Sequence, residues 1–321
     1  MNMRRTRLPG RGRFAGLMVS SIVFCLLAAL VFAYVAYNFC RINVPAKHIA
    51  VLTTKTGHKK LNLGNEQEVA PSPDYRGLQL NVLGEGRYFK NPSYWKWSVY
   101  PMIEIPENKL GVRVRLYGKD LPYGHFVVPA GGLDIGDPGF DPDQVGKGIV
   151  PEVLRAGRYS FNAILKDESG KIVNPRPRND YVEIVELHEP VTIPAGYKGV
   201  VTNLSGPLPE DPNQFLVEAG FRGVQKETLD EGTYYLNPYV QRVQAIDCRS
   251  QRFNLADGYD MGFPSKDGFW VSLDGIIEFK VKPEEAALVY VLYDEAKSNE
   301  GTQKSIDQEI IRKVIMPNAR S

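Results

Sequence analysis

The side chains that most often perform catalysis are scattered along this chain. Its four histidines are isolated from one another and from the cysteines, at His48, His58, His125 and His188. None of them has the His-x-x-x-His or Cys–His spacing of a metal site. Ser205 precedes a glycine, but Asn203-Leu204-Ser205-Gly206 lacks the first glycine of a hydrolase nucleophile elbow. We therefore expect no enzymatic activity, no catalytic or metal-binding residue and no cofactor.

One group of carboxylates has a composition that calcium would accept. It comprises Asp134, Asp137, Asp141 and Asp143, within a stretch rich in glycine and proline. Hard cations bind clustered carboxylates and loop carbonyls, but the spacing of three, four and two residues differs from that of the Asp-x-Asp-x-Asp-Gly calcium loop. We interpret these residues as solvated carboxylates in a long surface loop at 125–147.

The composition argues against two further classes of protein. The 39 basic and 37 acidic residues give a formal charge of +2, so the overall charge offers no argument for nucleic-acid binding. The three cysteines, Cys25, Cys40 and Cys248, lack the spacing of a disulfide framework or a zinc site. The fold must therefore depend on the packing of its apolar residues.

The N-terminal 40 residues have the composition of a membrane anchor. Five arginines lie within the first 13 residues, and no Asp or Glu precedes Glu66. Uncharged residues run from Phe14 to Cys40, and 24 of them would form a helix of roughly 36 Å, enough to cross a hydrocarbon core of about 30 Å. A cleaved signal peptide, the alternative, has an apolar core of only about 7 to 15 residues. We predict a basic cytoplasmic tail at 1–13, a single transmembrane helix at 14–40, and an extracytoplasmic remainder, periplasmic in a bacterium.

A pattern of glycine, leucine, glycine, tyrosine and asparagine occurs three times after this segment. In each copy the successive spacings are six, three, two and three residues. The copies are Gly77, Leu83, Gly86, Tyr88 and Asn91; Gly148, Leu154, Gly157, Tyr159 and Asn162; and Gly223, Leu229, Gly232, Tyr234 and Asn237. Such repetition indicates one structural unit used three times. We interpret each copy as part of a small antiparallel β module in which the tyrosine packs beneath a glycine turn.

A β-branched residue and a proline precede each copy, at Val44-Pro45, Ile105-Pro106 and Ile193-Pro194. Because proline lacks an amide donor, we expect it to open a strand or to lie at a sheet edge. A glycine stands five residues after the second and third prolines, at Gly111 and Gly199, whereas the first copy has Ala50 at that place. The pattern is close, but it is not perfectly kept.

These landmarks divide the chain downstream of the helix. We predict β modules at 43–104 and 105–188, followed by a domain at 189–321 whose β part ends at 282. Trp95 and Trp97 alternate along one expected strand of the first module, so both face the same side. We favour packing inside that module over contact with lipid headgroups, because a repeated unit needs a core.

Beyond residue 255 the pattern changes to strands followed by helices. Residues 269–281 are mostly alternating and rich in strand formers, and Asp267-Gly268 supplies a turn before them. Pro283 and the acidic residues after it favour a helix start, so we predict helices at about 283–297 and 305–320. The second helix is amphipathic, because one face carries Ile306, Ile310, Ile311, Val314 and Ile315.

Three motifs in this half of the chain are distinctive in combination. They are Ile193-Pro194-Ala195-Gly196 before Gly199-Val200-Val201, Glu231-Gly232-Thr233-Tyr234 before Asn237-Pro238, and Lys266-Asp267-Gly268 before Asp274-Gly275. With them, residues 190–321 resemble the SPFH or band 7 domain of stomatins, prohibitins, flotillins and the Hfl-type regulators of membrane proteases. Common members of that family lack the modules at 43–188. Many members also continue into a long C-terminal coiled coil, whereas the sequence reaches Ser321 before any sustained heptad pattern. Either this protein lacks the coiled coil or the sequence is part of a longer chain, and we expect the second.

The fold expected from these observations is an N-terminal transmembrane helix, tandem mostly-β modules and an α+β SPFH-like domain. The resemblance implies a membrane-anchored scaffold that forms a large homo-oligomer, alone or with a paralogue, as rings or cages. Such a scaffold would organise membrane microdomains and sequester or regulate membrane proteins such as a protease. Its partners would be the lipid bilayer, further copies of itself and that protein, and no nucleic acid. The alternative is an anchored module that binds an extracytoplasmic ligand or envelope polymer without forming rings.

Overall fold

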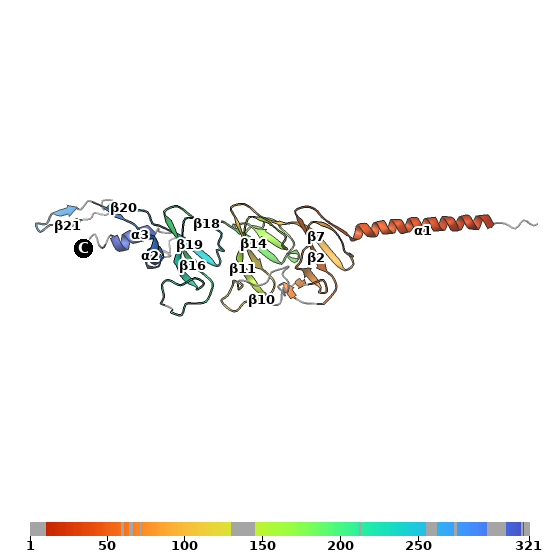
Figure 1. Ribbon diagram of the computed structural model, residues 1–321, viewed down its shortest axis with the longest axis horizontal. Coiled ribbons are helices and arrows are strands. Elements are labelled where there is room, and N and C mark those ends of the chain that lie inside the picture. Colours follow the sequence, from red (N-terminus) through yellow and green to blue (C-terminus); the bar gives the residue numbers. More distant parts are fainter. Residues whose placement is uncertain are drawn as a thin grey trace, which may run out of the picture. The chain divides into compact units, whose positions relative to one another are not determined.

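The computed structural model describes residues 11–58, 61–63, 67–70, 72–129, 145–211, 213–254, 262–272, 275–293, 306–315 and 317 (Figure 1). One long helix precedes a series of short strands, and short helices follow near the C-terminus, so the described content is mostly β. The chain divides into two compact units. The first comprises Met1–Met102, Ser160–Asn162 and Pro177–Tyr181, and the second comprises Ile103–Tyr159, Ala163–Arg176 and Val182–Ser321.

The first unit begins with helix α1, Arg11–Cys40, drawn in red in Figure 1. Strand β1, Arg41–Val44, follows without a linker and pairs in antiparallel fashion with β6, Gly86–Phe89. A five-stranded sheet has the order β3-β4-β5-β2-β7. Its strands are β2 His48–Thr54, β3 Leu61–Leu63, β4 Gln67–Ala70, β5 Gly77–Gln79 and β7 Trp95–Pro101.

The second unit opens with a similar arrangement. Strand β8, Ile103–Ile105, pairs in antiparallel fashion with β12, Gly157–Tyr159. A five-stranded sheet has the order β10-β11-β9-β14-β13. Its strands are β9 Leu110–Arg115, β10 Lys119–Asp120, β11 Gly146–Leu154, β13 Ala163–Lys166 and β14 Glu183–His188. The predicted loop at 125–147 is therefore shorter than expected, because Gly146 and Lys147 already belong to β11.

The arrangement occurs once more in the second unit. Strand β15, Val191–Ile193, pairs with β18, Gly232–Tyr234, and a three-stranded sheet has the order β17-β16-β19. The strands of that sheet are β16 Tyr197–Asn203, β17 Gly223–Leu229 and β19 Gln241–Asp247. We call β1, β2, β5, β6 and β7 the first strand set, β8, β9, β11, β12 and β14 the second, and β15–β19 the third.

The three strand sets share their register residue for residue. The residue before each proline pairs with the second glycine of the repeated pattern, as Val44 with Gly86, Ile105 with Gly157, and Ile193 with Gly232. The first glycine of the pattern pairs with the last residue of the central strand, as Gly77 with Thr54, Gly148 with Arg115, and Gly223 with Asn203. The sequence spacing thus corresponds to a shared pairing of strands.

The prolines lie in turns and do not open strands, contrary to the sequence-based expectation. In each strand set the amide three residues after the proline donates to the proline carbonyl, at 3.3 Å for His48, 3.3 Å for Lys109 and 3.2 Å for Tyr197. The third residue of each turn has a positive φ, 63° at Lys47, 64° at Asn108 and 83° at Gly196. Proline is compatible with the first place of such a turn, because only its carbonyl takes part in the turn's hydrogen bond and its missing amide donor is not needed.

The change from glycine to alanine at residue 50 has a steric explanation. The nearest atom to a Cβ at Gly111 would be Cδ1 of Ile105, at 2.6 Å, followed by Cγ1 of Val185 at 2.9 Å; the nearest to a Cβ at Gly199 would be Cδ1 of Ile193, at 2.3 Å. The first strand set has Val44 and Ala50 at the corresponding positions, in one buried cluster, and valine has no Cδ1 atom. Both residues are buried there, so the smaller valine makes room for the methyl group of alanine.

The C-terminal part contains two pairs of antiparallel strands and the expected helices. Within 269–281 the structure describes two strands, β22 Trp270–Ser272, paired with β21 Gly262–Pro264, and β23 Ile276–Phe279, paired with β20 Gln251–Asn254. A 3-10 turn, η2, spans Pro283–Glu285 and leads into α2, Ala286–Tyr293. The last helix begins as α3, Ile306–Ile310, and continues as a π-helix, η3, over Ile311–Ile315. The remainder of the predicted helix at 283–297 lies outside the described residues.

Candidate functional site

The apolar part of α1 is the one segment of the described chain with the length and composition of a membrane span. It covers Ile22–Cys40, has a mean hydropathy of 2.2 and is not buried against the rest of the protein. Exposed leucine, valine and phenylalanine side chains on a helix of this length are costly in water and favourable in a bilayer. This part of α1 is therefore a candidate anchor.

The two tryptophans after the first turn pack within the first strand set. Trp95 and Trp97 lie on β7 and contact a buried cluster formed by Ile42, Val44, Ala50 and Leu52. Their indoles therefore contribute to the core, in agreement with the expected packing inside the module.

The glycines and tyrosines of the repeated pattern form three nearly identical turns. The second glycine of each copy has a φ that side-chain-bearing residues rarely adopt, +143° at Gly86, +153° at Gly157 and +147° at Gly232. Each tyrosine ring lies where a Cβ atom would be 3.5 to 3.7 Å away, and its hydroxyl donates to a backbone carbonyl of the same turn. These bonds are Tyr88 to Glu85 at 3.4 Å, Tyr159 to Arg155 at 2.9 Å and Tyr234 to Asp230 at 3.1 Å. The motif fixes a turn and presents no reactive group.

The asparagines of the pattern differ in their environments. Asn91 is exposed, and its Oδ1 accepts a bond from the amide of Ser93 at 2.9 Å. Asn237 is only 4% exposed; its Oδ1 accepts from the amide of Tyr239, and its Nδ2 donates to the carbonyl oxygens of Val150 at 3.0 Å and Pro151 at 3.2 Å. Asn162 is 1% exposed, and neither of its side-chain polar atoms has a hydrogen-bond partner among the described residues.

The bond from Asn237 belongs to a larger junction between the second and third strand sets. The hydroxyl of Tyr239 donates to Oε2 of Glu186 at 2.7 Å, and this bond, with burial, raises the pKa of Tyr239 to about 12. The ring of His188 meets that of Tyr239 edge to face at 5.7 Å. Burial lowers the pKa of His188, and the nearby carboxylates of Glu186 and Glu168 oppose the effect.

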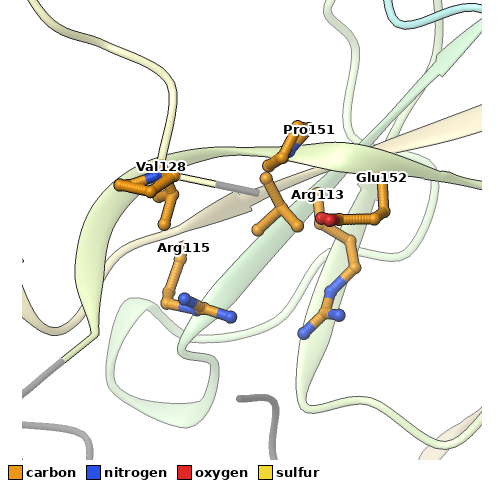
Figure 2. A pocket seen from close by; sticks show the side chains of 7 residues that line it. Arg113, Arg115, Val128, Pro151 and Glu152 are labelled. Carbon is orange, nitrogen blue, oxygen red and sulfur yellow. The ribbon is translucent and has the colours of Figure 1, made fainter. Parts of the chain in front are cut away.

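A pocket of about 250 Å³ lies on one face of the sheet in the second strand set. It is lined by Arg113, Arg115, Val128, Pro129, Val150, Pro151 and Glu152. Figure 2 shows the side chains of Arg113 and Arg115 extending in the same general direction from their strand, while Pro151 and Glu152 come from β11. The lining combines guanidinium groups, one carboxylate and apolar side chains, and it contains no imidazole, thiol or hydroxyl group. Its chemistry suits the binding of a small polar molecule better than covalent catalysis.

Both arginines also belong to a buried ion network. Arg113 donates from Nε and Nη2 to the two carboxylate oxygens of Glu183, at 2.9 and 2.8 Å, and Glu183 is fully buried. Nε of Arg115 lies 3.9 Å from Oε1 of the same carboxylate, and the hydroxyl of Tyr117 donates to that oxygen at 3.3 Å. The two-pronged contact fixes the geometry of the pair.

The sequence gives only a partial signal for this network. Arg113 and Arg115 are two residues apart on one strand, so they share a face of the sheet. Their partner Glu183 lies 70 residues after Arg113 and is brought opposite by the β9–β14 register. The matching central-strand position in the other sets is also polar and buried, Thr54 in the first and Asn203 in the third.

The remaining residues considered from the sequence do not come together in the described parts of the chain. No group of three or more histidine, cysteine, aspartate or glutamate side chains there has the geometry to hold a metal. Cys25, Cys40 and Cys248 are not bonded to one another. The acidic residues Asp134, Asp137, Asp141 and Asp143 lie outside the described residues, so the surface-loop interpretation stays a prediction.

Comparison with known families identifies the domain at the C-terminal end of the sequence. Residues 191–321 match the model of the SPFH domain / Band 7 family, from β15 through the last helix. This segment is an SPFH domain. The predicted resemblance at 190–321 is thus confirmed, and an SPFH domain is in general a feature of membrane-associated scaffold proteins. The comparison with curated proteins found no match.

The SPFH domain joins its β and helical parts through one core. Buried residues of this core come from β16, β19, α2, α3 and the segment after β23, namely Val200, Ile246, Ala286, Ala287, Ile310 and Val281. The last helix therefore packs against the domain, and its predicted apolar face accounts for that contact, with Ile310 buried and Val314 and Ile315 beside it.

Proposed function

We propose that this chain is the subunit of a membrane-anchored scaffold that assembles into rings or cages. The observation that carries the proposal is the SPFH domain at 191–321 on a chain whose α1 has the length and composition of a membrane span. An anchor confines the copies to two dimensions, and sideways contacts that are weak singly become strong when many act together. The tandem strand sets would form β modules between the anchor and the SPFH domain.

The mass of the detergent-solubilised full chain, measured by light scattering and followed by imaging of the particles, tests the assembly. Large closed particles of uniform size are the expected result. A monodisperse monomer would contradict the scaffold. That outcome would favour an anchored module that binds a small extracytoplasmic ligand, for which the pocket beside Arg113 and Glu152 offers a place.

We further propose that the basic N-terminus is cytoplasmic and the remainder extracytoplasmic. Tyr123 is fully exposed and serves as a reporter position. In a chain whose three cysteines are changed to serine, Tyr123→Cys should react in intact cells with a maleimide that cannot cross membranes. Reaction only after the cells are opened would reverse the orientation.

The partners would be membrane proteins that the assembly encloses or excludes, a membrane protease among them. Cross-linking in native membranes, followed by purification of the full chain, should enrich such a protease relative to an unrelated single-pass protein. Equal recovery in both purifications would contradict this part of the proposal.

A further inference from the structure

The ribbon formed by β1 and β6 is fixed to the end of α1. No residue separates Cys40, the last of the helix, from Arg41, the first of β1. The amide of Lys90 donates to the carbonyl of Cys40 at 2.9 Å, and the rings of Tyr37 and Phe89 have centroids 5.2 Å apart. Contacts on both sides of the junction therefore hold the ribbon against the last turns of the helix.

The two faces of this ribbon differ in character. Ile42, Val44 and Tyr88 point to one side and pack in the core of the first strand set. Cross-strand partners share a face, so Arg41 and Phe89 lie together on the other side, as do Asn43 and Arg87. Phe89 is 54% exposed on that outer face, a large apolar side chain beside the end of the candidate membrane helix.

The outer face and its margin are basic. Arg41 and Arg87 lie on it, and Lys90 follows β6 directly, with its ammonium group 4.5 Å from the centre of the Trp95 ring. The nearby carboxylate of Glu85 accepts a bond from the backbone amide of Lys47 at 2.6 Å. Basic side chains beside a membrane span attract anionic lipid headgroups, and aromatic rings favour the same interfacial layer.

The other two strand sets lack this combination at the matching positions. Arg41 corresponds to Met102 in the second set and Pro190 in the third, and Lys90 corresponds to Phe161 and Leu236. Phe89 corresponds to Ser160 and Tyr235. All three sets share the paired strands, and the second set also keeps a basic residue, Arg158, at the position of Arg87. Arg41 and Lys90, at the end of the ribbon next to α1, have no basic counterpart in the other two sets. The shared strand pairing therefore does not require basic residues at the positions of Arg41 and Lys90.

We propose that the outer face of the β1–β6 ribbon, with Arg41, Arg87 and Phe89 on it and Lys90 at its margin, binds the headgroups of anionic phospholipids in the bilayer that α1 crosses. The proposal rests on the membrane anchoring in the proposed function. The phenylalanine would enter the interfacial layer while the three cationic side chains contact phosphate groups. This contact would hold the first strand set against the membrane surface.

The depth of the ribbon can be measured with the full chain in liposomes. In a cysteine-free background, Asn43→Cys places a fluorophore on the outer face without removing any of the four residues. The matched control is Glu104→Cys, at the same ribbon position of the second set. Lipids with a nitroxide on the headgroup should quench the label at residue 43 and leave the label at residue 104 almost unchanged. Equal quenching at both positions would overturn the proposal.

A third label separates failure of the lipid contact from failure of the anchor. Leu30→Cys lies in the apolar part of α1 and should be quenched by lipids with a nitroxide deep in the acyl chain. Deep quenching at residue 30 without headgroup quenching at residue 43 would overturn the lipid contact and leave the anchor intact. Absence of quenching at residue 30 would overturn both.

The choice of headgroup is tested by comparing anionic and zwitterionic nitroxide lipids at equal mole fractions. Each basic side chain near a membrane surface favours anionic lipid by about fivefold, so the anionic lipid should quench residue 43 more strongly. Arg87→Gln combined with Lys90→Gln should abolish most of that preference, and Arg158→Gln, at the position of Arg87 in the second set, should not. Equal quenching by both lipids in the unchanged ribbon would overturn the recognition of anionic headgroups.

Discussion

The side-chain amide of Asn237 donates to the backbone carbonyl of Val150, 87 residues earlier in the chain. This bond connects the turn that ends the repeated pattern of the third strand set to β11 of the second. The junction of these two sets therefore contains a buried, directional contact, to which Tyr239 and Glu186 add a second.

Replacement of Asn237 tests how much this contact contributes to the stability of the second unit. Asn237→Ala should lower the stability of the second unit by about 1 to 3 kcal/mol, because it leaves two carbonyl groups without their donor. The midpoint of urea unfolding of the full chain in detergent measures the loss. Asn91→Ala is the matched control, since Asn91 makes the same local bond to the second residue after it but is exposed. A loss of equal size in both variants would show that only the local bond matters.

The buried ion pair should be far more sensitive than an exposed one. Glu183→Ala leaves the guanidinium of Arg113 buried without its carboxylate, and we expect a loss of about 3 to 5 kcal/mol in unfolding free energy. Glu168→Ala, which removes the partly exposed partner of Lys109 at 2.7 Å, should cost about 1 kcal/mol or less. Thermal unfolding of both variants provides the comparison. Similar losses would contradict the assignment of the Arg113–Glu183 pair to the structural core.

The packing of Ile105 against Gly111 predicts a strong coupling between the two positions. Gly111→Ala alone should destabilise by about 1 to 3 kcal/mol through overpacking, and Ile105→Val alone by about 0.5 to 1.5 kcal/mol through a small void. The double variant reproduces the Val44 and Ala50 combination and should be more stable than the sum of the two losses predicts. A complete double-mutant cycle of unfolding free energies measures the difference. Strict additivity would show that the space is not shared.

The pKa of His188 makes stability depend on pH. Burial lowers this pKa in the folded state, so the unfolded state binds the proton more readily. Protonation of His188 therefore does not change the free energy of unfolding well above pH 6.5, which is about the pKa of an unfolded histidine. As the pH falls below that value, it lowers the free energy of unfolding by less than about 1.4 kcal/mol per pH unit. Unfolding midpoints at pH 7.5 and 5 should therefore differ less in His188→Gln than in the unchanged chain. His125→Gln, at an exposed histidine, should keep the original dependence, and an identical slope in all three proteins would contradict the prediction.

Spacing within the chain was sufficient to predict the repeated strands, since each turn is encoded locally. Gly86, Gly157 and Gly232 adopt a backbone conformation that glycine favours, and each tyrosine two residues later closes its own turn. The SPFH resemblance was likewise carried by local motifs such as Ile193-Pro194-Ala195-Gly196. Turn motifs of this kind can be predicted from sequence because they depend only on neighbouring residues.

Features that depend on distant pairing were missed or misplaced. The expectation that proline opens a strand was wrong because the sequence does not show that the strand lies before Pro45 and the turn after it. The Arg113–Glu183 pair requires the β9–β14 register, which joins residues about 70 positions apart.

The exchange of Ile105 and Gly111 for Val44 and Ala50 also constrains how such repeats can diverge. A copy that begins with isoleucine and glycine cannot gain the alanine first without forcing a methyl group into occupied space. It can lose one methyl group from isoleucine first, because a small void costs less than a collision. In a repeat that starts with isoleucine and glycine, the substitution to valine is therefore expected to come before the substitution to alanine.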